Sequence, residues 1–229
     1  LFAVKDTGEG EVRVTKLASL KMTLPSVIIE QTKIEVSSMV TMIENVFLKL
    51  EEALKEKEKI AKYNDNIVEA EDKLDLYEKE IYDSNFSLLS KSLSKELIED
   101  TRMNLLTCDE YETIGDYQNR IANRLYMLYE NSIELDETRA KMTFKLHSLV
   151  VELFNDISRA ARTGEKELYS AGIKKYQTLK TYYKEVKREH FSRSENIPAR
   201  LNTGYLDIIN YYKRIADHTY NIIEYVMKI

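Results

Sequence analysis

Residues 111–124 read Tyr-Glu-Thr-Ile-Gly-Asp-Tyr-Gln-Asn-Arg-Ile-Ala-Asn-Arg, and residues 212–225 read Tyr-Lys-Arg-Ile-Ala-Asp-His-Thr-Tyr-Asn-Ile-Ile-Glu-Tyr. In both stretches an aspartate stands between two isoleucines, and the two copies lie 101 residues apart. The matching positions are Ile114, Asp116 and Ile121 in the first copy and Ile215, Asp217 and Ile222 in the second. A helical unit repeated at this distance predicts two related halves.

The rest of the chain has the composition of long helices. Only 6 glycines and 2 prolines occur in 229 residues, too few for the frequent turns of a sheet. Apolar residues recur every three or four positions in six stretches, which predicts helices at about 28–62, 64–91, 95–132, 136–163, 165–190 and 197–228. We expect an all-α fold of duplicated antiparallel three-helix bundles. Its parts are an arm or linker over 1–27, a first repeat over 28–133 and a second over 134–229.

Charge and motif content argue against several functional classes. A net charge of −5 is unlike the basic footprint of a nucleic-acid binder. The sequence shows no Gly-rich phosphate loop, Gly-x-Ser-x-Gly elbow or His-Glu-x-x-His motif, so we expect no enzyme activity and no small-molecule substrate. Cys108, the single cysteine, is expected to be a buried or half-buried structural thiol. The chain starts at Leu1 rather than Met, and we expect it to be a piece of a longer protein.

The polar face of the first copy is rich in oxygen ligands. At about 100° per residue, Glu112, Asp116, Asn119 and Asn123 fall on one side of the helix, and Asp109 lies close to them. Carboxylates one turn apart can bind a hard cation such as Mg²⁺ or iron. Any amphipathic helix also has a polar side, so both interpretations stay open.

The second copy carries a different polar face. Lys213 takes the place of Glu112 and would pair with Asp217 one turn later, which argues against a metal cluster on this half alone. No histidine has a Glu three positions before it, which disfavours a ferritin-like dimetal site. We expect His218 to be a core or boundary residue and His190 to lie on the surface.

Both copies resemble a known family signature. Residues 108–117, Cys-Asp-Glu-Tyr-Glu-Thr-Ile-Gly-Asp-Tyr, resemble the PhoU motif Asp-Asp-Leu-Glu-Arg-Ile-Gly-Asp-His, and residues 213–222 resemble its later half. PhoU proteins are duplicated three-helix bundles that regulate phosphate uptake, and some bind multinuclear iron or zinc clusters through this motif. The resemblance therefore implies the six-helix fold and a regulatory role over about 28–228.

The resemblance also implies candidate metal ligands. The first motif gives Asp109, Glu110, Glu112 and Asp116, with Thr113 and Tyr117 departing from the pattern. The second keeps Asp217 and His218, while Asn210, Tyr211 and Lys213 replace carboxylates. The predicted set for a divalent metal or iron is Asp109, Glu112, Asp116 and Asp217, and the depleted second motif predicts weak metal binding or none.

The start of the chain resembles a particular member of this family. The polar arm leading into Leu24-Pro25-Ser-Val-Ile-Ile-Glu looks like the join after the last membrane helix of bacterial Na⁺/phosphate cotransporters. This implies a regulatory domain that modulates phosphate uptake on the cytoplasmic side of the inner membrane. Its partner would be the transmembrane part of the same transporter, or a second copy in a homodimer.

Two alternatives stay open. One is a free-standing PhoU regulator that binds a phosphate ABC transporter and a sensor kinase. The other is a membrane-binding helical scaffold, suggested by the locally basic stretch 166–188, although the net negative charge argues against it.

Overall fold

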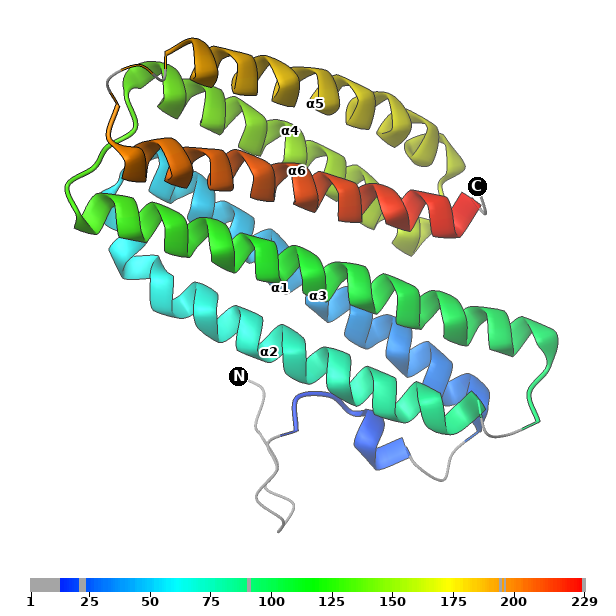
Figure 1. Ribbon diagram of the computed structural model, residues 1–229. Coiled ribbons are helices and arrows are strands. Elements are labelled where there is room, and N and C mark those ends of the chain that lie inside the picture. The colour runs from blue at the N-terminus through cyan, green and yellow to red at the C-terminus, as the bar shows by residue number, and fades with distance from the viewer. Residues whose placement is uncertain (1–12, 21–23, 90–91, 194, 196, 228–229) are drawn as a thin grey trace.

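The computed structural model describes residues 13–20, 24–89, 92–193, 195 and 197–227. Within these residues the chain forms six α-helices, one short 3-10 helix and no strand (Figure 1). The 3-10 helix is η1 (Leu17–Leu20), and the long helices are α1 (Pro25–Lys55), α2 (Glu58–Leu89), α3 (Lys95–Glu130), α4 (Glu137–Thr163), α5 (Lys166–Ser192) and α6 (Ala199–Met227). The predicted all-α, six-helix fold is confirmed.

Local sequence signals explain where the helices begin and end. Pro25 opens α1, three residues before the predicted start, because proline needs no hydrogen-bond partner in the first turn. The side chain of Ser94 accepts a hydrogen bond from the backbone of Leu97 at the start of α3, and Asp136 caps α4 in the same way. Gly164 ends α4 with φ of 74°, the left-handed conformation that glycine adopts without strain.

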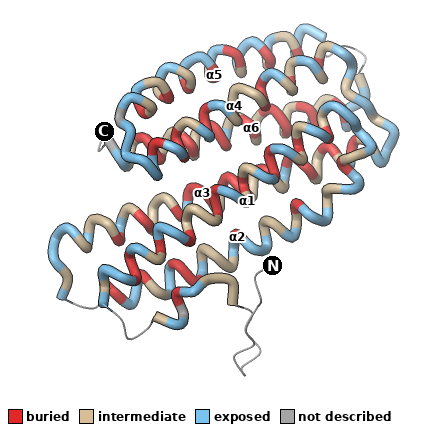
Figure 2. The backbone as a smooth tube through the Cα atoms, turned by 180° about the vertical axis from the view of Figure 1, so that it is seen from behind, coloured by how far each residue is buried: buried red, intermediate tan, exposed pale blue. Residues whose placement is uncertain are grey.

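The helices form two antiparallel three-helix bundles. Helices α1–α3 make one and α4–α6 the other, and α3 and α6 lie side by side where the bundles meet (Figure 1). Figure 2 shows buried positions along the helices where the two bundles meet. The four isoleucines of the repeated stretches are all fully buried. The pairing of α3 with α6 is the main contact between the two halves.

Aromatic side chains form a core that both bundles share. Phe47 of α1 lies 5.3 Å from Phe154 of α4, and Tyr111 of α3 lies 6.0 Å from the same ring. His147 of α4 packs edge-on against Phe47 and bonds to the hydroxyl of Tyr212 through Nδ1 at 3.0 Å. Burial lowers the pKa of His147 to about 4, so this histidine is neutral and structural.

The described part of the predicted arm docks on the first bundle. Glu80 of α2 accepts hydrogen bonds from the backbone of Val14 and Thr15, and Glu35 of α1 accepts one from the backbone of Lys16. Both carboxylates are buried, with 5% exposure each. The rest of the predicted 1–27 arm includes residues 1–12 and 21–23, which lie outside the described residues. None of the described helices is long and apolar enough to cross a bilayer.

Candidate functional site

The two repeated stretches lie on α3 and α6, and their polar faces turn toward different neighbours. Glu112 on α3 lies close enough to Glu78 and Asp75 of α2 for their negative charges to raise its pKa. Asp217 on α6 instead accepts a hydrogen bond from Tyr176 of α5. Each motif therefore faces the second helix of its own bundle, as the duplication requires.

On the first motif face, carboxylates gather without enough cations to balance them. Burial and the nearby charges of Glu78, Asp75 and Asp116 raise the pKa of Glu112 to about 7. Burial and the charge of Asp109 likewise raise the pKa of Glu78. Burial and the neighbouring carboxylates therefore both favour the protonated forms of Glu112 and Glu78.

Asp116 is the carboxylate on this face with a clear ionic partner. Arg120, one turn later on α3, binds both of its oxygens, at 2.7 and 3.0 Å. The same guanidinium lies over the ring of Tyr117, 5.2 Å from its centroid. Asp116 is thereby held in a local ion pair at the surface.

The corresponding aspartate of the second motif is neutralised. Lys213 forms a salt bridge with Asp217, as the spacing predicts, and the Tyr176 hydroxyl donates to the same oxygen at 2.6 Å. Tyr176 also stacks on Tyr220, with 4.3 Å between ring centroids. The second motif face is therefore a closed structural contact between α5 and α6.

Glu110 has a structural role that the motif resemblance did not reveal. It is 3% exposed and accepts hydrogen bonds from His218 at 2.7 Å, from Asn221 at 3.0 and 3.2 Å, and from Tyr225 at 2.6 Å. All three donors are on α6, so this carboxylate ties the two halves together. Glu110 lies four residues before the buried Ile114, so both residues are on the same side of α3. This spacing is the sequence signal that could have placed Glu110 on the apolar side.

The four predicted metal ligands do not meet at one point. Asp109, Glu112 and Asp116 lie on the face toward α2, whereas Asp217 lies toward α5. Among residues 13–20, 24–89, 92–193, 195 and 197–227, no three His, Cys, Asp or Glu side chains form a group that could hold a metal ion. Metal binding by this set stays a prediction.

Two further sequence predictions are settled by burial. Cys108 is fully buried beside Met39, and burial raises the pKa of its thiol, so it is the structural cysteine expected. His190 is 2% exposed, so its predicted surface position is wrong. It accepts a hydrogen bond from Arg139 at 3.2 Å and donates to Asn202 at 2.7 Å. These polar partners come from α4 and α6, and sequence spacing within α5 could not show them.

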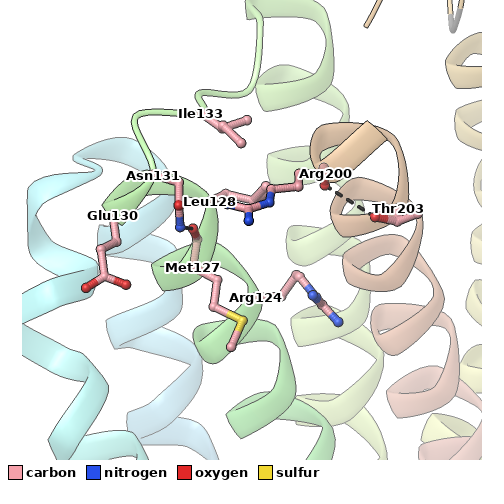
Figure 3. A pocket seen from close by; sticks show the side chains of 8 residues that line it. All are labelled: Arg124, Met127, Leu128, Glu130, Asn131, Ile133, Arg200 and Thr203. Atoms are coloured by element: carbon pink, nitrogen blue, oxygen red, sulfur yellow. Dashed lines mark hydrogen bonds between the residues drawn. The ribbon is translucent and has the colours of Figure 1, made fainter. Parts of the chain in front are cut away.

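A pocket of about 400 Å³ lies at the opposite end of α3, beside the start of α6 (Figure 3). Two arginines line it, and both already have partners. Arg124 forms a salt bridge with Asp207 at 2.8 Å, and Arg200 donates to the side chain of Asn131 at 2.9 Å. The pocket is therefore a weaker candidate than the α2–α3 face for a functional site.

Comparison with known proteins agrees with the duplicated fold. The PhoU domain model matches residues 36–125 and again 144–226. The phosphate transport system regulatory protein PhoU from Streptococcus pneumoniae superposes with a TM-score of 0.77 at 18% identity, covering 89% of this chain and 95% of that one. PhoU from Pseudomonas aeruginosa gives a TM-score of 0.77 at 18% identity, covering 86% and 94%. No curated protein sequence matches the chain. Because the family model matches both repeats and most of the sequence, this chain belongs to the PhoU domain family.

Proposed function

We propose that this chain is a non-catalytic regulator of phosphate transport that acts as a free-standing PhoU-type protein, by binding a phosphate ABC transporter and a sensor kinase on the cytoplasmic side. The observation that carries the proposal is the PhoU domain match in each of the two repeats. The coverage of 95% of the Streptococcus pneumoniae PhoU chain, whose title names a phosphate transport regulator, adds support.

The free-standing alternative has more support than the cotransporter domain expected from the first residues. Both reported structural matches are PhoU proteins, and neither is a cotransporter. The described arm residues Val14 and Lys16, which precede the stretch that resembles the join, are bound to α2 and α1. They make a structural contact that a PhoU regulator and a transporter domain could share.

The geometry of the motif supports binding rather than catalysis. Glu110 and Asp217 are held by neighbouring side chains on α6 and α5, and they stabilise the fold. The α2–α3 face around Glu112 is left with partly or fully exposed carboxylates, which suits contact with a partner. A regulator acts by preferring one state of its partner over another, and a surface of this kind can supply such a preference.

The test is deletion and complementation in the organism that encodes the chain. A reporter driven by a phosphate-starvation promoter should become active at high phosphate in the deletion strain. Residues 1–229 expressed separately should restore repression. Repression restored only when these residues are joined to a membrane segment would support the cotransporter context instead. A reporter that responds normally without the chain would overturn the phosphate role.

A further inference from the structure

The face of α2 that turns toward α3 changes character along its length. Side chains spaced three or four residues apart form one stripe on this helix. We call it the α2 stripe: Glu71, Asp75, Glu78, Tyr82, Phe86 and Leu89. Its first three members are carboxylates, and its last three are aromatic or aliphatic. The stripe is therefore amphipathic along the helix axis.

Helix α3 continues the same pattern beside α2. Asn119 influences the pKa of Glu71, and the charge of Asp109 raises that of Glu78, so the two helices run in antiparallel register. Continuing this register places Leu89 opposite the first turns of α3, where Ile98 lies. Acidic residues of α3 therefore face the acidic half of the stripe, and an apolar residue of α3 faces its apolar half.

The apolar half is exposed to an unusual degree. Phe86 is 71% exposed, Leu89 44%, Ile98 45% and Tyr82 37%. They belong to the last turns of α2 and the first turn of α3, and these helix ends lie at the end of the first bundle that extends away from the second (Figure 1). Helical spacing and the antiparallel register place these exposed apolar side chains on neighbouring turns, and exposed apolar residues placed together mark an interaction surface.

We propose that the α2–α3 face is the docking surface for a basic amphipathic helix of a partner protein. Its apolar residues would cover Phe86, Leu89 and Ile98, and its lysines or arginines would lie along Glu78 and Glu112. The stripe from residue 71 to residue 89 is about 27 Å long, the length of a helix of about 18 residues. Helix-in-groove binding of this type uses anchors at the same three- and four-residue spacing.

Charge decides which partner fits this surface. Burial and mutual repulsion raise the pKa of Glu71, Asp75 and Glu78, so a cationic partner would relieve an existing electrostatic cost. Anionic lipid headgroups and nucleic acids would be repelled by the same groups. Arg102 is exposed one helical turn after Ile98 on α3, and it would direct the cationic residues of the partner toward the acidic half.

The inference does not depend on the phosphate role, because binding is measured on the purified chain. The probe is a fluorescein-labelled helical peptide of 18 residues, with leucines along one face and lysines beside them in one half only. A reference peptide carries glutamates in place of the lysines. Fluorescence anisotropy is recorded in chelator, which keeps metal ions off the carboxylates.

Variants on the surface are compared with matched variants elsewhere. Glu78→Gln/Glu112→Gln and Phe86→Ser should each weaken binding of the lysine peptide by about tenfold or more. Glu58→Gln/Asp65→Asn removes two exposed carboxylates of α2 away from the stripe, and Leu48→Ser removes an exposed leucine of α1. Both controls should bind as the unchanged chain does.

Several results would overturn the proposal. They are failure of the unchanged chain to bind the lysine peptide, equal binding of the glutamate peptide, and equal binding by all variants. Sedimentation that shows a dimer dissociated by Phe86→Ser would assign the surface to a second copy of the chain. Preferential binding to phosphatidylglycerol vesicles over neutral ones, lost in Phe86→Ser, would assign it to a membrane.

Discussion

His218 on α6 lies with its Nδ1 atom 2.7 Å from Oε2 of Glu110 on α3, although 108 residues separate the two in sequence. The Glu110 side chain is 4% exposed and that of His218 is 24% exposed. This contact brings a residue of the first motif together with a residue of the second. The two family signatures are therefore joined across the seam between the bundles.

Replacing Glu110 should destabilise the fold. Glu110→Ala leaves the donors of Asn221, His218 and Tyr225 without their acceptor, at an expected cost of about 3 kcal/mol in the free energy of unfolding. Urea denaturation followed by circular dichroism measures this. Asp109→Ala, at the exposed neighbouring position, should change stability by less than about 0.5 kcal/mol. Equal effects of the two variants would show that the network contributes nothing.

Glu112 should make stability depend on pH. Its pKa in the folded chain is about 7, above the ordinary value of 4.5, so the folded state binds more protons between these values. The contribution of Glu112 to the free energy of unfolding is greatest at low pH. It falls by roughly 1 kcal/mol, with solvent screening included, as the pH rises from about 4.5 to about 7. Glu112→Gln should flatten the curve between about pH 5 and pH 8. If the free energy of unfolding depends on pH equally in Glu112→Gln and in the unchanged chain, the raised pKa of Glu112 is contradicted.

The shared aromatic core should make the two repeats unfold together. Phe154→Ala removes a fully buried ring that contacts α1 and α3, at an expected cost of about 3–5 kcal/mol. Calorimetry of the unchanged chain should show one transition, with equal calorimetric and van't Hoff enthalpies. Two separate transitions, only one of them shifted in Phe154→Ala, would show that the repeats are independent domains.

The docked arm should protect its own cleavage sites. Trypsin can cut after Arg13 and Lys16, which flank the backbone amides bound by Glu80. Glu80→Gln weakens these charge-assisted hydrogen bonds, so cleavage at both sites should accelerate roughly fivefold to thirtyfold. Glu58→Gln on the same helix serves as the control. Unchanged cleavage in Glu80→Gln would mean that these hydrogen bonds do not hold the arm.

Metal content tests the predicted ligand set. Asp116 and Asp217 each have a cationic partner and face different helices, so we predict substoichiometric metal in protein purified without chelator. Elemental analysis should give the same value for Glu112→Ala/Asp116→Ala. Stoichiometric iron or zinc in the unchanged chain, lost in the double variant, would make these residues true ligands.

The fold could be predicted from the sequence because its signals are local. Ser94, Asp136 and Gly164 set helix ends through their own backbone neighbours. The isoleucines of the two repeated stretches are buried, since apolar residues spaced three to four positions apart give a helix one buried side.

The polar contacts could not be predicted because their partners are distant in sequence. Glu110 and Glu80 resemble ordinary surface carboxylates until α6 and the arm pack over them. His190 follows the charged residues Lys187, Arg188 and Glu189 in sequence, yet it is buried with Arg139 of α4 and Asn202 of α6 as its partners. Spacing within one helix gives the face of a residue, but only tertiary structure gives its partner.

Uptake of radiolabelled phosphate is the most direct measurement of the proposed role of this chain in regulating phosphate transport. Cells lacking the chain should take up phosphate at the same high rate whether external phosphate is scarce or abundant. Expression of residues 1–229 should restore the fall in uptake when phosphate is abundant. Uptake that falls normally without the chain, and does not change when the chain is expressed, would contradict the account.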